Sequence, residues 1–114
     1  MEQRPLTKEE YVDKVLQAYR HTPGTMGTVR RPDRLIAMQW YERYIPLTAV
    51  ENGFVLAVTR RLYRPSGAPP LGTIRSLAYF APVIEEVRRM RVSPDYFQYL
   101  RGKIQKFLQL QKIP

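Results

Sequence analysis

The sequence contains no cysteine and only one histidine, His21, among its 114 residues. The missing thiols exclude disulfide bonds, zinc sites built on cysteine and thiol nucleophiles, and their absence agrees with a reducing compartment. No apolar run approaches the ~20 residues that span a bilayer, and residues 1–5 lack the apolar core of a signal peptide. We therefore expect a cytoplasmic protein that does not bind membranes.

Groups that catalyse reactions or bind metals are not clustered in the sequence. A lone histidine beside a loop is more often a surface or capping residue than a catalyst. Glu85 and Glu86 are adjacent, so on a helix their side chains diverge by about 100° and cannot face one substrate together. We expect a protein that is not an enzyme and that carries neither a cofactor nor a metal ion.

Positive charge is what the sequence has in excess. The 19 lysines and arginines outnumber the 10 acidic residues, which gives a formal net charge of +9 and a pI near 10.2. This balance favours contact with phosphate-rich surfaces, so nucleic acid is the leading class of partner. The excess is greatest after residue 87, where Asp95 alone opposes Arg88, Arg89, Arg91, Arg101, Lys103, Lys106 and Lys112.

The first segment of helical periodicity covers residues 7–20. Thr7 can cap this helix, and Glu10 can reach back to Thr7 as the acid of a capping box. The charges of the segment cancel, which makes it the expected packing or partner element. Its apolar face comprises Tyr11, Val12, Val15, Leu16 and Tyr19.

Two further helices are expected on either side of Pro46. The first begins near Pro32 and the second runs over residues 47–63. The pair fits an ordinary helical hairpin or a helix-turn-helix motif, and we favour the hairpin because Tyr44 stands where that motif usually carries glycine. The residues expected to point inward from the first helix are Leu35, Ile36, Trp40 and Tyr44, and those from the second are Leu47, Val50, Phe54, Ala57, Val58 and Leu62.

A loop rich in proline and glycine, residues 64–72, precedes the last two helices. We expect a helix from a cap at Thr73 to about Met90, with a kink or break near Pro82, because proline removes a backbone hydrogen bond. Ser93 should cap the final helix. The sequence thus predicts one all-α domain of about five helices, and the apolar face of its last helix comprises Phe97, Leu100, Ile104, Phe107 and Leu108.

Between residues 29 and 99 the apolar residues follow a particular order. Leu35 and Trp40 precede a short turn, Val50, Phe54 and Ala57 lie on the next helix, and Tyr79-Phe80-Ala81-Pro82-Val83-Ile84-Glu85-Glu86-Val87 follows, before the turn Arg91-Val92-Ser93-Pro94. This order resembles the DnaD-like domain of bacterial and phage replication proteins, whose signature reads Tyr-Ile-x-x-Ile-Leu-x-x-Trp. Val87 replaces the tryptophan, and Pro82 lies inside the motif.

The resemblance implies a small helical module of the kind associated with primosome assembly and DNA binding. It divides the chain, 1–114, into an N-terminal helix at 1–21, a DnaD-like core at 29–91 and a basic amphipathic helix at 93–112. We therefore expect an accessory protein that binds nucleic acid, with DNA favoured and RNA as the other candidate, in replication or in a DNA transaction of a mobile element.

The residues expected to bind nucleic acid are basic side chains, with tyrosines that stack on bases. Tyr96 and Tyr99 leave the apolar face of the last helix, whereas Phe97 and Phe107 belong to it. The alternative function is a small structural subunit or adaptor that docks on a larger protein or an RNA–protein assembly. We also expect a larger protein partner or self-association. The residues expected to bind nucleic acid are Arg88, Arg89, Arg91, Arg101, Lys103, Lys106, Tyr79 and Tyr99. A second face is expected from Arg30, Arg31, Arg60 and Arg61.

Overall fold

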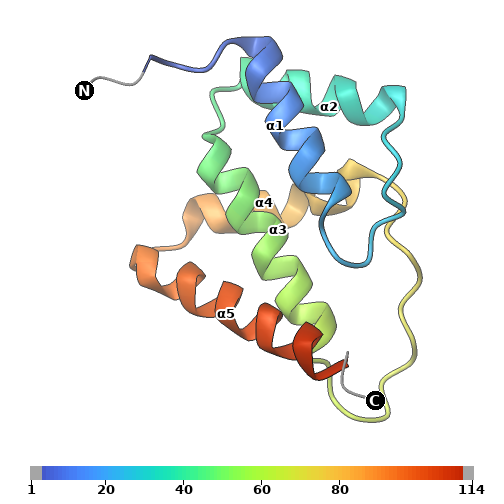
Figure 1. Ribbon diagram of the computed structural model, residues 1–114. Coiled ribbons are helices and arrows are strands. Elements are labelled where there is room, and N and C mark those ends of the chain that lie inside the picture. Colours follow the sequence, from blue (N-terminus) through green and yellow to red (C-terminus); the bar gives the residue numbers. More distant parts are fainter. Residues whose placement is uncertain (1–3, 112–114) are drawn as a thin grey trace.

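The computed structural model describes residues 4–111, and 67% of this part of the chain is helical (Figure 1). The elements are α1 (Lys8–Arg20), α2 (Arg31–Glu42), α3 (Leu47–Leu62), the 3₁₀ helix η1 (Leu77–Phe80), α4 (Ala81–Arg89) and α5 (Pro94–Gln111). Helix α3 lies at the centre and packs against α1, α4, α5 and η1. Within residues 4–111 no strand forms beyond a single bridge between Thr25 and Ile74. The prediction of an all-α domain with five α-helices is confirmed.

Helix α1 begins with the expected capping box. The Thr7 hydroxyl accepts a hydrogen bond from the Glu10 amide at 3.1 Å, and the Glu10 carboxylate accepts one from the Thr7 amide at 2.9 Å. Arg4 pairs with the same carboxylate at 2.6 Å. These two hydrogen bonds fix the start of α1, and its predicted apolar face is buried in full: Tyr11, Val12, Val15, Leu16 and Tyr19.

The turn between α2 and α3 explains why one tyrosine leaves the core. Tyr44 adopts a left-handed backbone with φ of 60°. The Ile45 amide donates to the Trp40 carbonyl and the Tyr44 amide to the Tyr41 carbonyl, both at 3.0 Å, which is the pattern of a helix that ends in a left-handed residue. Ile45 and Trp40 are buried, whereas Tyr44 is 91% exposed. The prediction that Tyr44 points inward is therefore wrong.

Helix α2 buries Trp40 as predicted and covers Ile36 in part, but the rest of its buried face differs from the predicted one. Asp33, Ala37 and Trp40 are buried and share one side of the helix, while Leu35 projects from the opposite side and is 46% exposed. The Asp33 carboxylate accepts hydrogen bonds from the Arg30 amide at 2.9 Å and from the Leu77 amide at 2.8 Å. This buried side chain therefore joins the start of α2 to η1.

The break at Pro82 is confirmed, but before it only the short helix η1 forms, and the expected start at Thr73 is wrong. Thr73 caps no helix, because the segment around Ile74 is extended. The Ile74 amide donates to the Gly24 carbonyl at 2.7 Å, and the Ile74 carbonyl accepts from the Met26 amide at 3.1 Å. Helix α4 begins at Ala81, directly after η1, so Pro82 lies in the first turn, where its missing N–H leaves no bond unmade.

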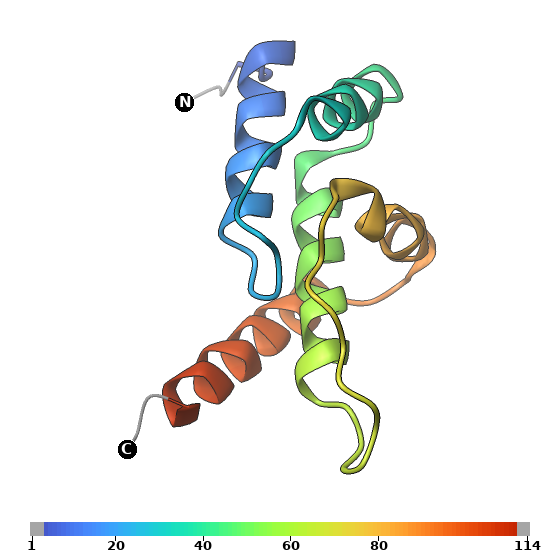
Figure 2. The ribbon, with the colours of Figure 1, turned by 90° about the vertical axis from the view of Figure 1, so that its right-hand side faces the viewer.

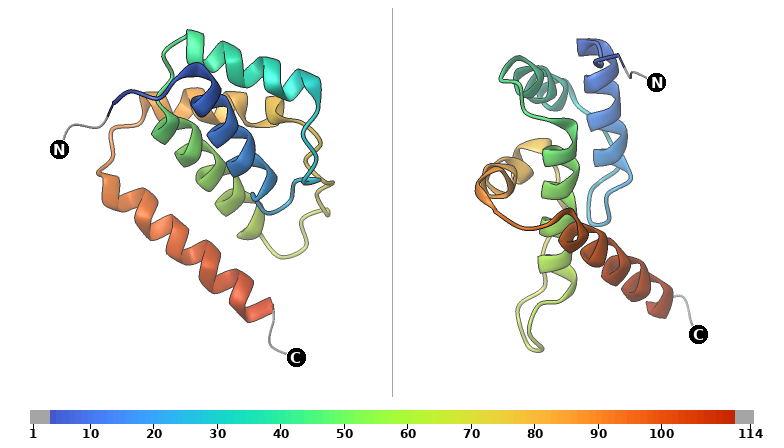
Figure 3. Two further views of the ribbon diagram at one scale, coloured as in Figure 1. Left: turned by 45° about the horizontal axis from the view of Figure 1, so that its top comes forward. Right: turned by 90° about the vertical axis from the view of Figure 1, so that its left-hand side faces the viewer.

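Helix α5 lies across α3 and extends away from the other helices toward its C-terminal end (Figures 2 and 3). Phe97 and Leu100 are buried in a cluster with Leu56 and Val87. Ile104, Phe107 and Leu108 are half-buried, so the predicted apolar face is correct in position and only its first part is fully covered. In the part of the chain described, no helix is both long and apolar enough to cross a membrane.

Candidate nucleic-acid interface

Most acidic side chains on the body of the protein are already paired. Glu85 accepts from Arg43 at 2.9 Å and from Arg88 at 3.3 Å, and Glu86 pairs with Arg60 at 2.5 Å. Hydrogen bonds from these arginines hold the pKa of Glu85 and of Glu86 below the usual value. Two of the predicted binding residues, Arg60 and Arg88, therefore have partners within the protein.

The predicted residues Arg61 and Tyr79 contact one another. The Arg61 guanidinium donates to the Tyr79 hydroxyl at 3.3 Å and to the Gly72 carbonyl at 2.7 Å, and its central carbon lies 5.6 Å from the centroid of the Tyr79 ring. These contacts tie the loop before η1 to the end of α3. Arg61 and Tyr79 thus have a structural role in the protein.

The second face predicted from four arginines is divided in the structure. Arg30 and Arg31 lie at the start of α2, while Arg60 and Arg61 lie in the last turn of α3. Figure 1 shows that these two helix ends occupy different parts of the molecule. Arg60 pairs with Glu86 on α4 and Arg61 donates to Tyr79 in η1, so these two neighbouring side chains have different partners.

A cluster of tyrosines and lysines lies where α5 meets the end of α3. The Lys103 ammonium lies 4.2 Å from the centroid of the Tyr63 ring and 5.7 Å from that of Tyr99. The Tyr63 hydroxyl donates to the Lys103 carbonyl at 2.9 Å. Helical spacing places Tyr96, Tyr99, Lys103 and Lys106 on one side of α5. We call Tyr63, Tyr96, Tyr99, Lys103 and Lys106 the tyrosine–lysine patch.

The tyrosines of this patch are open to solvent. Tyr63 is 44% exposed, Tyr96 36% and Tyr99 62%. By contrast Phe97 is buried, and Phe107 is half-buried with its ring 5.5 Å from Tyr63. The prediction that the tyrosines leave the apolar face and the phenylalanines belong to it is confirmed.

The other basic residues of the C-terminal part do not belong to the patch. Arg101 turns toward α3, where its guanidinium donates to the Asn52 side-chain oxygen at 3.1 Å. Arg89 and Arg91 are exposed at the end of α4 and in the linker to α5. Of the eight residues predicted as the main site, the structure brings Tyr99, Lys103 and Lys106 together.

Tyr63 is the residue of the patch that the sequence did not single out. It follows the last turn of α3 and stands among three basic residues, Arg60, Arg61 and Arg64. An aromatic residue within a cluster of cations was the available signal. Its contact with α5 depends on the packing of α5 against α3, which the sequence does not show.

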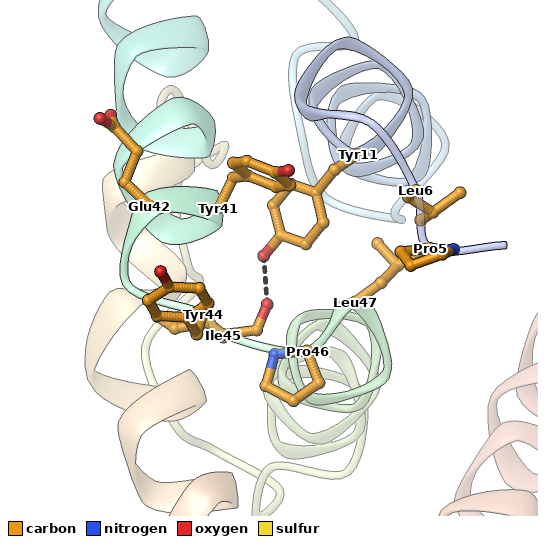
Figure 4. Close-up of a pocket in the computed structure, with 9 residues that line it drawn as sticks. All are labelled: Pro5, Leu6, Tyr11, Tyr41, Glu42, Tyr44, Ile45, Pro46 and Leu47. Atoms are coloured by element: carbon orange, nitrogen blue, oxygen red, sulfur yellow. Dashed lines mark hydrogen bonds between the residues drawn. The ribbon is translucent and has the colours of Figure 1, made fainter.

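A second surface feature is a groove of about 700 Å³ between α1 and the turn from α2 to α3 (Figure 4). At the floor of the groove the Tyr11 hydroxyl donates to the Ile45 carbonyl at 2.7 Å. Burial raises the pKa of Tyr11 to about 12. The ring of Tyr41 packs 5.4 Å from that of Tyr11. The groove lies beside the helix that the adaptor alternative assigns to docking, and that alternative stays a prediction.

The side chains considered for catalysis are separated. The His21 ring contacts the Gln17 carbonyl at 2.8 Å at the end of α1, and Glu85 and Glu86 face different arginines. Across residues 4–111, no three His, Asp or Glu side chains gather in a group that could hold a metal ion.

Comparison with known proteins found no match to the chain among family models, curated proteins or solved structures. The resemblance to the DnaD-like domain therefore stays a prediction.

Proposed function

We propose that this protein binds nucleic acid through the tyrosine–lysine patch and acts as a non-enzymatic accessory protein in a DNA transaction such as replication. The observation that carries the proposal is that the Lys103 ammonium lies close to two exposed tyrosine rings, Tyr63 and Tyr99. Proteins that bind nucleic acid without reading its sequence combine positive side chains for the phosphates with aromatic rings for the bases. Both kinds of group meet at this patch.

The charge around the patch favours a polyanion. From residue 88 to residue 111 the chain has six basic residues and one acid, Asp95, while Lys112 lies outside the described residues. Within the described part of the chain, Arg89, Arg91 and Lys106 take part in no ion pair, so their charge is available to phosphates. Each phosphate that is neutralised releases condensed counterions, and affinity then falls as salt is raised.

The central position of α3 disfavours a helix-turn-helix mode of binding. In that mode the second helix, here α3, would lie in the major groove of DNA. Helix α3 is instead covered by α1, α4 and α5. Two of the polar side chains of α3 are also engaged within the protein: Asn52 is bonded to Arg101, and the Thr59 hydroxyl donates to the Val55 carbonyl at 2.8 Å. The exposed patch on α5 is thus the better site.

Fluorescence anisotropy of the full chain with labelled single-stranded DNA, duplex DNA and RNA, over a series of salt concentrations, tests the proposal. Lys103→Gln combined with Lys106→Gln should weaken binding to all of these and lower the log–log salt slope by about 0.7–0.9 for each phosphate that is no longer neutralised. Lys14→Gln, which alters an exposed lysine on α1, is the matched control and should bind like the unmodified protein. Equal affinity and salt slope for the double variant and the control would exclude the patch as the site.

A further inference from the structure

We infer that the tyrosine–lysine patch takes unpaired bases, so that its ligand is single-stranded nucleic acid. Bases would stack on Tyr63 and Tyr99, and the phosphates between them would lie against Lys103 and Lys106. The inference rests on the proposed function and adds the class of ligand to it.

The Tyr63 ring is held ready for such contact. Its hydroxyl donates to the Lys103 carbonyl at 2.9 Å, and its ring meets Phe107 at 5.5 Å with an interplanar angle of 64°. These two contacts restrict the rotation of the ring, yet 44% of the residue stays exposed. A ring that is fixed before binding loses little conformational entropy when a base stacks on it.

The two rings are close enough for one strand to reach both. Because the Lys103 ammonium lies 4.2 Å from one centroid and 5.7 Å from the other, the centroids of Tyr63 and Tyr99 are at most about 10 Å apart. Nucleotides that are neighbours or next neighbours in a flexible strand fall within this separation. Lys103, which lies near both rings, can reach the phosphate between the two bases.

A base can displace the lysine from the ring faces. A cation over an exposed ring favours that arrangement by a factor of about two to five. A stacked base contributes a factor of about 5 to 150 to affinity. A base therefore replaces the ammonium at the ring face, and the displaced ammonium pairs with a phosphate.

Duplex nucleic acid offers much less to this patch. Inside a duplex the faces of the bases are covered by the neighbouring pairs, so only phosphates and groove edges are accessible. The lysines can still contact phosphates, but the tyrosine rings have no base to stack on. The patch should therefore distinguish single strands from duplexes without reading the base sequence.

The test compares oligothymidine with an abasic strand of the same length, which keeps every phosphate and lacks every base. Anisotropy should show that the full chain binds oligothymidine about 5 to 150 times more tightly at one salt concentration. Tyr99→Ala should reduce this ratio at least severalfold, whereas Tyr99→Phe, which keeps the ring, should preserve it. Tyr44→Ala removes a 91% exposed tyrosine from the turn between α2 and α3 and should leave the ratio unchanged.

The outcomes separate this inference from the proposed function. Equal affinity for the two strands, with salt-dependent binding retained, would overturn the stacking inference and leave the proposed function standing. A ratio that falls equally in Tyr99→Phe and Tyr99→Ala would also overturn it, because the ring face would not be the cause. Absence of binding to either strand, with duplex DNA still bound, would overturn the inference alone. Absence of binding to single strands, duplex DNA and RNA at low salt would overturn both proposals. Circular dichroism of each variant confirms that the fold is retained.

Discussion

Gly53 lies where α3 and α4 cross, and its replacement by alanine sets two opposing effects against each other. A Cβ atom at position 53 would lie 2.5 Å from Cγ1 of Ile84 and 3.3 Å from its Cα. Because the second of these atoms belongs to the backbone, a change of side-chain rotamer cannot remove the whole clash. Helix α4 would have to move away from α3.

The magnitudes predict a net loss of stability for Gly53→Ala. Alanine improves helix propensity by about 0.8–1 kcal/mol relative to glycine, while overpacking of a core costs about 1–3 kcal/mol or more. We therefore expect the free energy of unfolding to fall by up to about 2 kcal/mol. Urea denaturation followed by the fluorescence of the buried Trp40 measures this change.

Gly102 is the matched control for this prediction. It lies within α5, and a Cβ atom added there would meet nothing within 4 Å. Gly102→Ala should therefore raise the free energy of unfolding by about 0.5–1 kcal/mol, because helix propensity acts alone. If Gly53→Ala stabilises the protein as much as Gly102→Ala does, the close crossing of α3 and α4 is refuted.

The remaining predictions concern the stability contributed by the turn at Tyr44, by the helix cap at Thr7 and by the ion pair of Glu10. Tyr44→Gly should raise stability by up to about 1 kcal/mol relative to Tyr44→Ala, because only glycine relieves the left-handed backbone; a lower urea midpoint for the glycine variant would contradict this. Thr7→Ala should lower the free energy of unfolding by about 1 kcal/mol, measured in urea, and an unchanged midpoint would mean that the capping box contributes nothing. The hydrogen bond from Arg4 lowers the pKa of Glu10 from 4.5 to about 2. The contribution of this ion pair to the free energy of unfolding is therefore complete above the pKa of Glu10 in the unfolded chain, and it is lost as pH falls through the lower pKa of Glu10 in the folded protein. Arg4→Gln should thus reduce stability at pH 7 and should reduce it much less near pH 2, where the Glu10 carboxyl of the folded state is already partly protonated; an equal effect at both pH values would exclude the ion pair as the cause.

Local patterns in the sequence predict the parts of the fold that depend on local contacts. The capping box at Thr7 and the apolar spacing of α1 are contained in consecutive residues, and both are confirmed. The extended segment at Ile74 depends on hydrogen bonds to Gly24 and Met26, about fifty residues earlier in the chain. Periodicity carries no information on such bonds, so Thr73 resembles a helix cap in the sequence without being one in the fold.

The same distinction applies to the candidate site. Helical spacing alone places Tyr96, Tyr99 and Lys103 on one side of α5. Tyr63 joins them only because α5 packs against the end of α3. The buried role of Asp33 is hidden from the sequence for the same reason, since its partner is the amide of Leu77.

Photo-crosslinking of the full chain to a single strand that carries bromodeoxyuridine, followed by peptide mass spectrometry, tests the central claim most directly. The account predicts adducts at Tyr63 or Tyr99, which flank Lys103, and the disappearance of these adducts in high salt as binding weakens. Tyr44 serves as the internal reference because it is the more exposed residue, at 91%. Adducts at Tyr44 with none at Tyr63 or Tyr99 would contradict the assignment of the tyrosine–lysine patch as the binding site.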